Sequence, residues 1–309
     1  MRILLVGCSG FVGRALVPLL LEQGHHCTLV SRSPQPLPAI AHPQLTRLQA
    51  DPSQLASWQR ADLQAALAAA EAVVNLAGEP IAEKRWTPQH LQLLHDSRIL
   101  TTRHLVDALA ALPAGQRPAL LINGSAIGYY GTSTTSRFVE ASPAGNDVLG
   151  RLCVAWEAEA RRAESLCRVV ILRTGIVLAA DGGALGKMLP VFRLGFGGPL
   201  GDGQQWMSWI SRPDLCRLVA AALGDPAFAG AYNAVAPQPI TMAGFAAALG
   251  RCLGRPSLLP VPAAILSLLL GDGAKVVLEG QQVLPERLLQ QGFVFNDSEL
   301  SAALAAATS

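Results

Sequence analysis

Residues 3–13 read Ile3-Leu4-Leu5-Val6-Gly7-Cys8-Ser9-Gly10-Phe11-Val12-Gly13. The four apolar residues before the first glycine have the length and composition of a buried strand. Beyond the loop, apolar residues recur at helical spacing until Gly24 ends the pattern. The periodic residues are Phe11, Ala15, Leu16, Leu19 and Leu20. The stretch therefore predicts a strand, a glycine-rich loop and a helix, the opening unit of a parallel α/β sheet.

The loop places Gly7, Gly10 and Gly13 three residues apart. In a dinucleotide-binding loop the first glycine permits a tight turn, the second lets the backbone approach a pyrophosphate, and the third lets helix and strand pack closely. The helix N-terminus adds free N–H groups for the phosphates. A plain turn is the alternative, but the placement and flanking periodicity favour a dinucleotide site. The predicted binding residues are Gly7, Ser9, Gly10, Phe11, Val12 and Gly13.

The second predicted strand ends in Val30-Ser31-Arg32, with no carboxylate. An Asp or Glu here would accept hydrogen bonds from the adenosine ribose and repel a 2′-phosphate, whereas a guanidinium can clamp that phosphate. The sequence therefore predicts NADP(H) as the cofactor, bound by Ser31 and Arg32. A solvated surface arginine is the alternative for Arg32.

Two later segments also point to the cofactor. Asn75-Leu76-Ala77-Gly78 closes the fourth predicted strand with small residues, at the sheet edge where ligands of doubly wound sheets bind. We expect Leu76, Ala77 and Gly78 to line the cofactor. Asp51, after the third strand, is predicted to contact the adenine, although a helix N-cap is an equally good interpretation.

Strand-length apolar runs alternate with helix-length segments as far as Thr174. Such alternation is typical of parallel strands joined by right-handed helical crossovers. The predicted strands are 3–6, 27–30, 45–49, 72–76, 119–123 and 169–172, and the clearest later helices are 88–112 and 147–165. The predicted fold class is α/β, a Rossmann doubly wound parallel sheet with a smaller, mostly helical C-terminal substrate lobe.

Glycine-rich stretches interrupt this pattern after Thr174, with one more strand expected at 231–235 and a helix at 241–253. We expect an NADP-binding Rossmann domain over 1–240, in which residues 176–230 contribute to the substrate lobe. A small helical C-terminal domain is expected over 241–309.

The composition of the 309 residues excludes several classes of partner. A formal charge of +2 leaves no basic face for nucleic acid. The six cysteines lie far apart, and no cysteine or histidine has metal-ligand spacing, so we expect reduced thiols and no metal. No signal peptide is evident, and residues 261–270 are about half the ~20 residues that a membrane span needs. A cytoplasmic protein is expected.

Several segments occur in a familiar order: the glycine loop, Asn75-Leu76-Ala77-Gly78, Ser125-Ala126-Ile127-Gly128-Tyr129-Tyr130-Gly131 and Leu172-Arg173-Thr174-Gly175. Together they resemble the extended short-chain dehydrogenase/reductases. Trp206-Met207-Ser208-Trp209-Ile210, Tyr232-Asn233-Ala234-Val235-Ala236-Pro237 and the tail from Arg255 to Phe295 look like the atypical "epimerase family protein" branch. The resemblance covers essentially the whole chain. It implies NADP binding and a homodimer built on the helices 88–112 and 147–165.

Typical members use a Ser or Thr and a Tyr-x-x-x-Lys pair for proton transfer, but here no tyrosine and lysine have that spacing. Matching Glu157 to the acidic residue that often follows the pair puts Leu149 and Cys153 at the Tyr and Lys positions. A phenol without the lysine stays near a pKa of about 10 and is a poor base at neutral pH. The remaining proton-handling candidates are Ser125, Tyr129 and Tyr130, with Ser125 also beside the cofactor. A polar strand end and an aromatic wall are the alternatives.

The resemblance places the substrate loop in the region that contains Lys187, Gln205, Trp206 and Ser208. An indole can stack on a sugar-like or aromatic ring while amide and hydroxyl groups donate hydrogen bonds, although indoles more often serve packing. The leading interpretation is an NADP(H)-dependent epimerase or oxidoreductase acting on a small polar substrate. The rival is a non-catalytic NADP(H)-sensing or scaffolding protein, which the missing Tyr-x-x-x-Lys favours.

Overall fold

The computed structural model describes residues 1–32 and 40–308. Its centre is a seven-stranded sheet in the order β11-β7-β5-β4-β1-β2-β3, in which every neighbouring pair is parallel. The strands are β1 (Arg2–Val6), β2 (His26–Ser31), β3 (Leu45–Gln49), β4 (Ala72–Asn75), β5 (Leu120–Ala126), β7 (Arg168–Thr174) and β11 (Gly230–Ala234). Each overlaps a strand expected from the sequence, so the predicted Rossmann sheet is confirmed.

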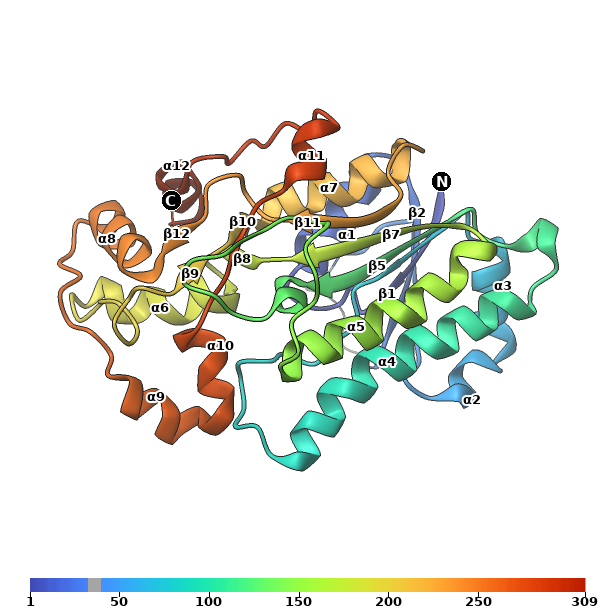
Figure 1. Cartoon of the computed structure of the whole chain (residues 1–309). Coiled ribbons are helices and arrows are strands. Elements are labelled where there is room, and N and C mark those ends of the chain that lie inside the picture. Colours follow the sequence, from blue (N-terminus) through green and yellow to red (C-terminus); the bar gives the residue numbers. More distant parts are fainter. Residues whose placement is uncertain (33–39, 309) are drawn as a thin grey trace.

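Helices cover both faces of the sheet (Figure 1). Alternate residues of β1 divide between two cores, because side chains of a strand point to opposite faces. Ile3 and Leu5 pack with α1 (Gly13–Glu22) and α7 (Arg212–Gly224). Leu4 and Val6 belong to the core under α3 (Ala61–Ala69), α4 (Pro88–Ala111) and α5 (Val148–Arg161). The short α2 (Leu55–Trp58) precedes α3. Burial on both faces explains why β1 is continuously apolar.

A lobe with a core of its own follows β7. It includes the parallel pair β8 (Ile176–Ala179) and β10 (Trp209–Ser211), with α6 (Gly183–Arg193) between them. β9 (Trp206–Met207) pairs with β12 (Ile240–Thr241), and α8 (Met242–Leu253) follows. Trp209, Phe245 and Leu304 are among its fully buried side chains. The lobe is thus assembled from distant parts of the chain.

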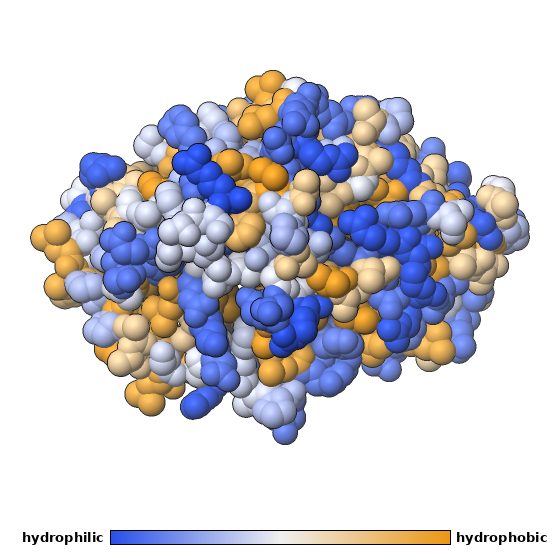
Figure 2. Space-filling view, in the orientation of Figure 1, coloured by the Kyte–Doolittle hydropathy of each residue, from blue (hydrophilic) through white to orange (hydrophobic). Residues whose placement is uncertain are grey.

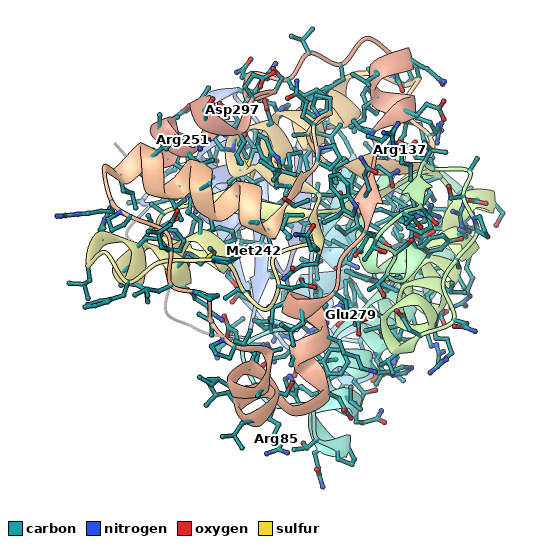
Figure 3. All side chains as sticks on the ribbon, turned by 60° about the vertical axis from the view of Figure 1, so that its left-hand side comes forward. Arg85, Arg137, Met242, Arg251, Glu279 and Asp297 are labelled. Carbon is teal, nitrogen blue, oxygen red and sulfur yellow. The ribbon has the colours of Figure 1, made fainter. Side chains whose placement is uncertain are left out.

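The C-terminal chain consists of short elements, and its residues 279–287 run along residues 132–140 of the Rossmann domain. They are α9 (Ala263–Leu270), α10 (Lys275–Leu278), β13 (Gln282–Val283), α11 (Glu286–Gln290) and α12 (Leu300–Thr308). β13 pairs with β6 (Arg137–Phe138), where the Arg137 Nε donates to Gln282 Oε1. Glu279 accepts a hydrogen bond from the Thr132 hydroxyl, so the labelled Arg137 and Glu279 in Figure 3 mark where these two segments meet. Among the described helices, none has the length and apolar content needed to cross a bilayer.

Candidate functional site

A cleft of about 550 Å³ lies at the carboxyl ends of β1, β2 and β4. It collects most of the residues that the sequence predicted for the cofactor. Those among its lining are Gly7, Ser9, Gly10, Phe11, Val12, Ser31, Arg32, Asp51, Leu76, Ala77 and Gly78. Of the predicted set, Gly13 and Ser125 are not among the described residues that line it.

A side chain at each of the three loop glycines would meet different surroundings. Gly7 has φ +72°, and a Cβ there would overlap the backbone of Ala77. A Cβ on Gly13 would overlap the Cys8 carbonyl, so this glycine lets α1 pack on the loop. A Cβ on Gly10, by contrast, would meet no protein atom within 4 Å. No side chain caps the N-terminus of α1. Gly10 and this helix terminus together therefore leave room and N–H donors for an anionic ligand.

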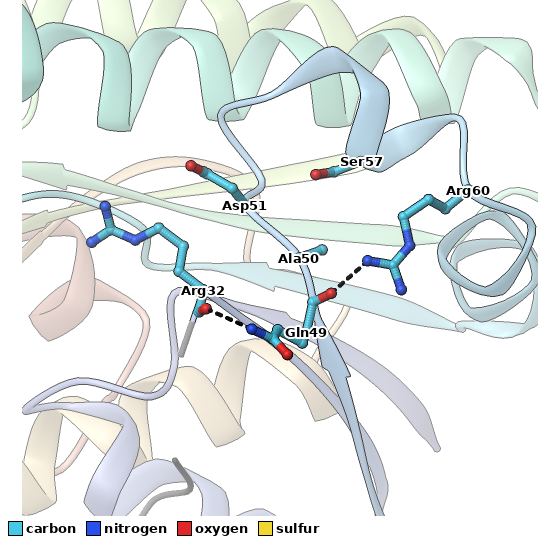
Figure 4. A pocket seen from close by; sticks show the side chains of 6 residues that line it. All are labelled: Arg32, Gln49, Ala50, Asp51, Ser57 and Arg60. Atoms are coloured by element: carbon cyan, nitrogen blue, oxygen red, sulfur yellow. Dashed lines mark hydrogen bonds between the residues drawn. The ribbon is translucent and has the colours of Figure 1, made fainter. Parts of the chain in front are cut away.

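A second cavity of about 620 Å³ shares Arg32 and Asp51 with the cleft (Figure 4). Its other arginine, Arg60, lies on the opposite side of Gln49 from the Arg32 guanidinium, with one N–H donated to the Gln49 carbonyl and an ion pair to Asp62 at 2.6 Å. Gln49 Nε2 also donates to the Arg32 carbonyl. Arg32 is thus the arginine whose guanidinium remains beside the cleft.

Two smaller contacts lie at the carboxyl ends of β2 and β3, where the sequence predicts the adenosine. Ser31 Oγ donates to Ser9 Oγ at 3.2 Å, which joins the end of β2 to the glycine loop. Asp51 Oδ1 accepts hydrogen bonds from the backbone N–H and the hydroxyl of Ser53. Asp51 therefore shapes the turn before α2 while it lines the cleft, which leaves its predicted contact with adenine a prediction.

Glu79 is a cleft residue that sequence reasoning missed. It directly follows Gly78, and its side chain is only 14 % exposed. The Glu79 carboxylate lies 3.7 Å from the Arg32 guanidinium and 3.3 Å from the Lys84 ammonium. Its position at the end of Asn75-Leu76-Ala77-Gly78-Glu79 was the available signal, since Leu76, Ala77 and Gly78 were already predicted to line the cofactor.

Ser125 and Tyr130 belong to a buried polar network between β5, α5 and β7. Ser125 donates to the Glu157 carboxylate at 2.8 Å, and Arg173 forms a bidentate pair with the same carboxylate at 2.7 and 2.9 Å. Arg173 also donates to the Tyr130 hydroxyl, which in turn donates to Asn233 Oδ1 at 2.6 Å. This ion pair was not identified from the sequence, because nothing local marks Arg173 as buried.

Electrostatics follow from the burial of the network. Burial raises the pKa of Tyr130 to about 12, against the opposing effect of the Arg173 charge and hydrogen bond. Burial opposes the charge of Arg173, but the hydrogen bonds and charge of Glu157 outweigh it and raise the pKa of that guanidinium. The half-buried Tyr129 stacks under Arg173, whose Cζ lies 3.5 Å from its ring centroid. The catalytic roles of Ser125, Tyr129 and Tyr130 stay predictions.

The face of α5 that would carry the Tyr-x-x-x-Lys pair is apolar. A Cβ on Gly128 would lie 3.2 Å from Leu149 Cβ and 4.0 Å from Cys153 Sγ, so both side chains face the 127–130 turn. Burial raises the pKa of Cys153 to about 12. Neither side chain can exchange a proton readily at neutral pH.

Two of the four predicted substrate residues, Gln205 and Ser208, are buried and hold other parts of the chain. Gln205 Nε2 donates to the carbonyls of Leu200 and Val277. The fully buried Ser208 hydroxyl donates to the Gln281 carbonyl and accepts from the Val283 N–H. The predicted substrate roles of these two residues stay untested, and their contacts anchor the C-terminal segment.

Trp206 and Lys187 are more accessible. The Trp206 indole N–H donates to the Thr134 carbonyl at 2.9 Å. The exposed Lys187 ammonium lies 3.9 Å from the Glu83 carboxylate and 3.5 Å from the Ala82 carbonyl, beside the loop that follows Glu79. The structure thus does not bring the four predicted substrate residues together on one surface of the cleft.

Comparison with known proteins agrees with this architecture. The model of the NAD dependent epimerase/dehydratase family matches residues 3–235, and a domain of unknown function (DUF1731) matches residues 261–307. The chain is 42% identical to the chloroplastic epimerase family protein SDR39U1 homolog of Arabidopsis thaliana, over 99% of this chain and 86% of that protein.

Solved structures give the same result. The structure of human epimerase family protein SDR39U1 (isoform2) with NADPH has a TM-score of 0.88 at 38% identity and covers 99% of both chains. UDP-glucuronic acid 4-epimerase from Bacillus cereus, at 18% identity, TM-score 0.78 and coverage of 99% and 98%, shares the fold alone. The resemblance seen in the sequence motifs is therefore confirmed. This chain belongs to the NAD dependent epimerase/dehydratase family, among the SDR39U1-like epimerase family proteins.

Proposed function

We propose that this protein binds NADP(H) in the cleft and acts as an epimerase or oxidoreductase on a small polar substrate, with a sugar-like ring as the first class to test. The observation that carries the cofactor is Gly10, whose missing side chain leaves space that no protein atom fills. The uncapped N-terminus of α1 supports it, and Arg32 supplies a cation beside the adenosine end. The related human protein was crystallised with NADPH.

Different groups of the cleft suit different parts of the cofactor. The loop N–H groups and the dipole of α1 suit the pyrophosphate, and the Arg32 guanidinium suits a 2′-phosphate. When bound, the nicotinamide supplies or accepts a hydride. Ser125 and Tyr130 are the proton-bearing side chains of the family motif. Ser125 donates its proton to Glu157, and Tyr130 donates its proton to Asn233.

The cofactor assignment is tested by Arg32→Ala. Loss of a charge-assisted contact to the 2′-phosphate should weaken NADPH binding by about 10- to 100-fold and leave NADH binding nearly unchanged. Titration of cofactor fluorescence measures both dissociation constants. Arg60→Ala is the matched control, because Arg60 pairs with Asp62 and should not alter the ratio. If Arg32→Ala left the ratio of the NADPH and NADH dissociation constants unchanged, the assignment of Arg32 to the 2′-phosphate would be wrong.

The second candidate function is an NADP(H) sensor or scaffold without turnover. The apolar Leu149 and Cys153 positions and the inward hydrogen bonds of Ser125 and Tyr130 favour it. NADPH consumption against a panel of carbonyl compounds and sugar nucleotides separates the two. Turnover that is lost in Ser125→Ala and Tyr130→Phe, with thermal melting showing both variants folded, supports the enzyme. Tight NADPH binding without turnover supports the sensor.

A further inference from the structure

The turn that carries Glu79 is fixed to α4 on both sides of its backbone. The Glu79 N–H donates to Ser97 Oγ at 3.0 Å, and its carbonyl accepts from Arg98 at 2.9 Å. The Arg98 guanidinium lies directly against Gly78, where a Cβ would come within 2.9 Å of Cζ. Arg98 is buried and its guanidinium also stacks on Trp156. The backbone of Glu79 is therefore held at a defined place in the wall of the cleft.

The Glu79 carboxylate stands between two cations that are far less constrained. The side chains of Arg32 and Lys84 are 61% and 62% exposed, whereas Glu79 is 14% exposed. Glu79 is thus the fixed member of the three, and the two cations are the members that can change partners. A partly buried charge is also screened less by salt than an exposed one.

We propose that Glu79 sets the preference between NADPH and NADH by competing with the 2′-phosphate for Arg32. This inference rests on the proposed NADP(H) function. In the cofactor-free protein Glu79 neutralises Arg32, and an arriving 2′-phosphate displaces it. The Lys84 ammonium then still balances the negative charge of the Glu79 carboxylate. NADH has a neutral 2′-hydroxyl at the same place, so it neither competes for Arg32 nor meets the same repulsion.

Among the described carboxylates that line the cleft, Glu79 is the one that pairs with Arg32. Any negative charge in the lining opposes the pyrophosphate, which NADPH and NADH share. Only a charge close to Arg32 acts on the 2′-phosphate in addition, because Coulomb energy falls with distance. Asp96 also lines the cleft, but its carboxylate bonds to Gln92 and His95. Asp96→Asn is thus a matched control that removes the same charge without releasing Arg32.

The first experiment measures the dissociation constants of NADPH and NADH for Glu79→Gln, Asp96→Asn and the unmodified protein by fluorescence titration. Glu79→Gln keeps the side-chain shape and should tighten NADPH by about three- to fivefold, as expected for a partly exposed charge pair. NADH affinity should change less than about twofold. Asp96→Asn should change the dissociation constants of NADPH and NADH by the same factor. Weaker NADPH binding in Glu79→Gln, or an equal shift for both cofactors, would overturn the proposal.

A double-mutant cycle tests the part assigned to Lys84. When Glu79 is present, Lys84→Met should weaken the binding of NADPH but not of NADH, because Glu79 then has Arg32 as its remaining cationic partner. In the Glu79→Gln background the same substitution should have little effect, since the carboxylate that it serves is gone. Equal effects in both backgrounds would mean that Lys84 acts directly on the phosphate and would overturn its role. Failure of the unmodified, folded protein to bind either cofactor would instead refute the proposed function.

Discussion

Among single residues, two of the loop glycines are required by the fold and the third is not. Packing within the protein accounts for Gly7 and Gly13, because side chains there would overlap Ala77 and Cys8. Gly10 meets no such obstacle, and its φ is not positive. Neither packing nor backbone conformation within the described protein therefore requires a glycine at position 10, which is the reason to test this residue alone.

Gly10→Ala should leave the fold intact and damage cofactor binding. The added methyl group meets no protein atom, so the free energy of unfolding should change by less than about 1 kcal/mol. Its intrusion into the cleft should weaken NADPH by about tenfold or more, which corresponds to about 1.4 kcal/mol or more. Thermal melting without cofactor and fluorescence titration with NADPH measure the two effects.

Gly13→Ala is the opposite case and serves as the control. Its Cβ would overlap the Cys8 carbonyl, so we expect a loss of about 2 kcal/mol or more in the free energy of unfolding. If Gly10→Ala destabilised the protein as much as Gly13→Ala, or if it bound NADPH normally, the ligand explanation of Gly10 would fail.

Residue-level prediction from the sequence worked where the signal was local. Gly10 and Arg32 belong to a strand, loop and helix pattern within the first 32 residues, so their positions in the cleft could be expected. Glu79 was missed because its significance depends on a distance to Arg32 across β1. The contacts of Gln205 and Ser208 depend on the path of residues 277–283, which no local pattern specifies.

At the scale of elements, buried parallel strands were predictable and the lobe was less so. The central strands β1 and β4 are nearly continuous apolar runs, because both faces of the sheet are covered there. α6 was not indicated, since glycine precedes it and Pro190 lies inside it. The structure supplies the reason for Gly182 and Gly183: the Phe11 ring packs against both, so a Cβ at either would come within about 3 Å of that ring.

The network that joins β5, α5 and β7 makes a prediction about pH. The pKa of Tyr130 is about 12 in the folded protein against 10.0 for an unperturbed phenol. The folded state therefore holds this proton more tightly than the unfolded state. Its contribution to stability is complete below pH 10 and is lost as the pH rises from about 10 to about 12. We expect the free energy of unfolding to decline across this window.

Tyr130→Phe isolates that contribution. At neutral pH the variant should be less stable by about 1–3 kcal/mol, because Asn233 and Arg173 each lose a buried partner. Between pH 10 and 12, however, its stability should fall less steeply than that of the unmodified protein. Urea unfolding at a series of pH values measures both. If the free energies of unfolding of the two proteins fell equally steeply between pH 10 and 12, the raised pKa of Tyr130 would not be the cause of the decline.

For the molecule as a whole, two surfaces could serve self-association, and they differ in character. Figure 2 shows apolar side chains at the left end and lower left, where α9 and the loop after α6 lie in Figure 1. The exposed apolar residues of this lobe surface are Val191, Leu194, Phe196, Leu258, Leu259, Ile265, Leu268 and Leu269. The other surface is formed by α4 and α5, which the ion pair Arg103–Glu159 joins, and Arg162, directly after α5, pairs with Asp107 of α4.

We predict a homodimer through α4 and α5. Val148 and Val154 are 44% and 42% exposed on α5. The ion pairs Arg103–Glu159 and Arg162–Asp107 hold α5 against α4, so association there orders few side chains. Val154→Glu should convert the dimer to a monomer in light scattering at micromolar concentration, with unchanged thermal melting of the protomer. Leu268→Glu, which places the same charge on the lobe surface, should leave the dimer intact. A monomeric unmodified protein, or dissociation by Leu268→Glu alone, would refute this assignment.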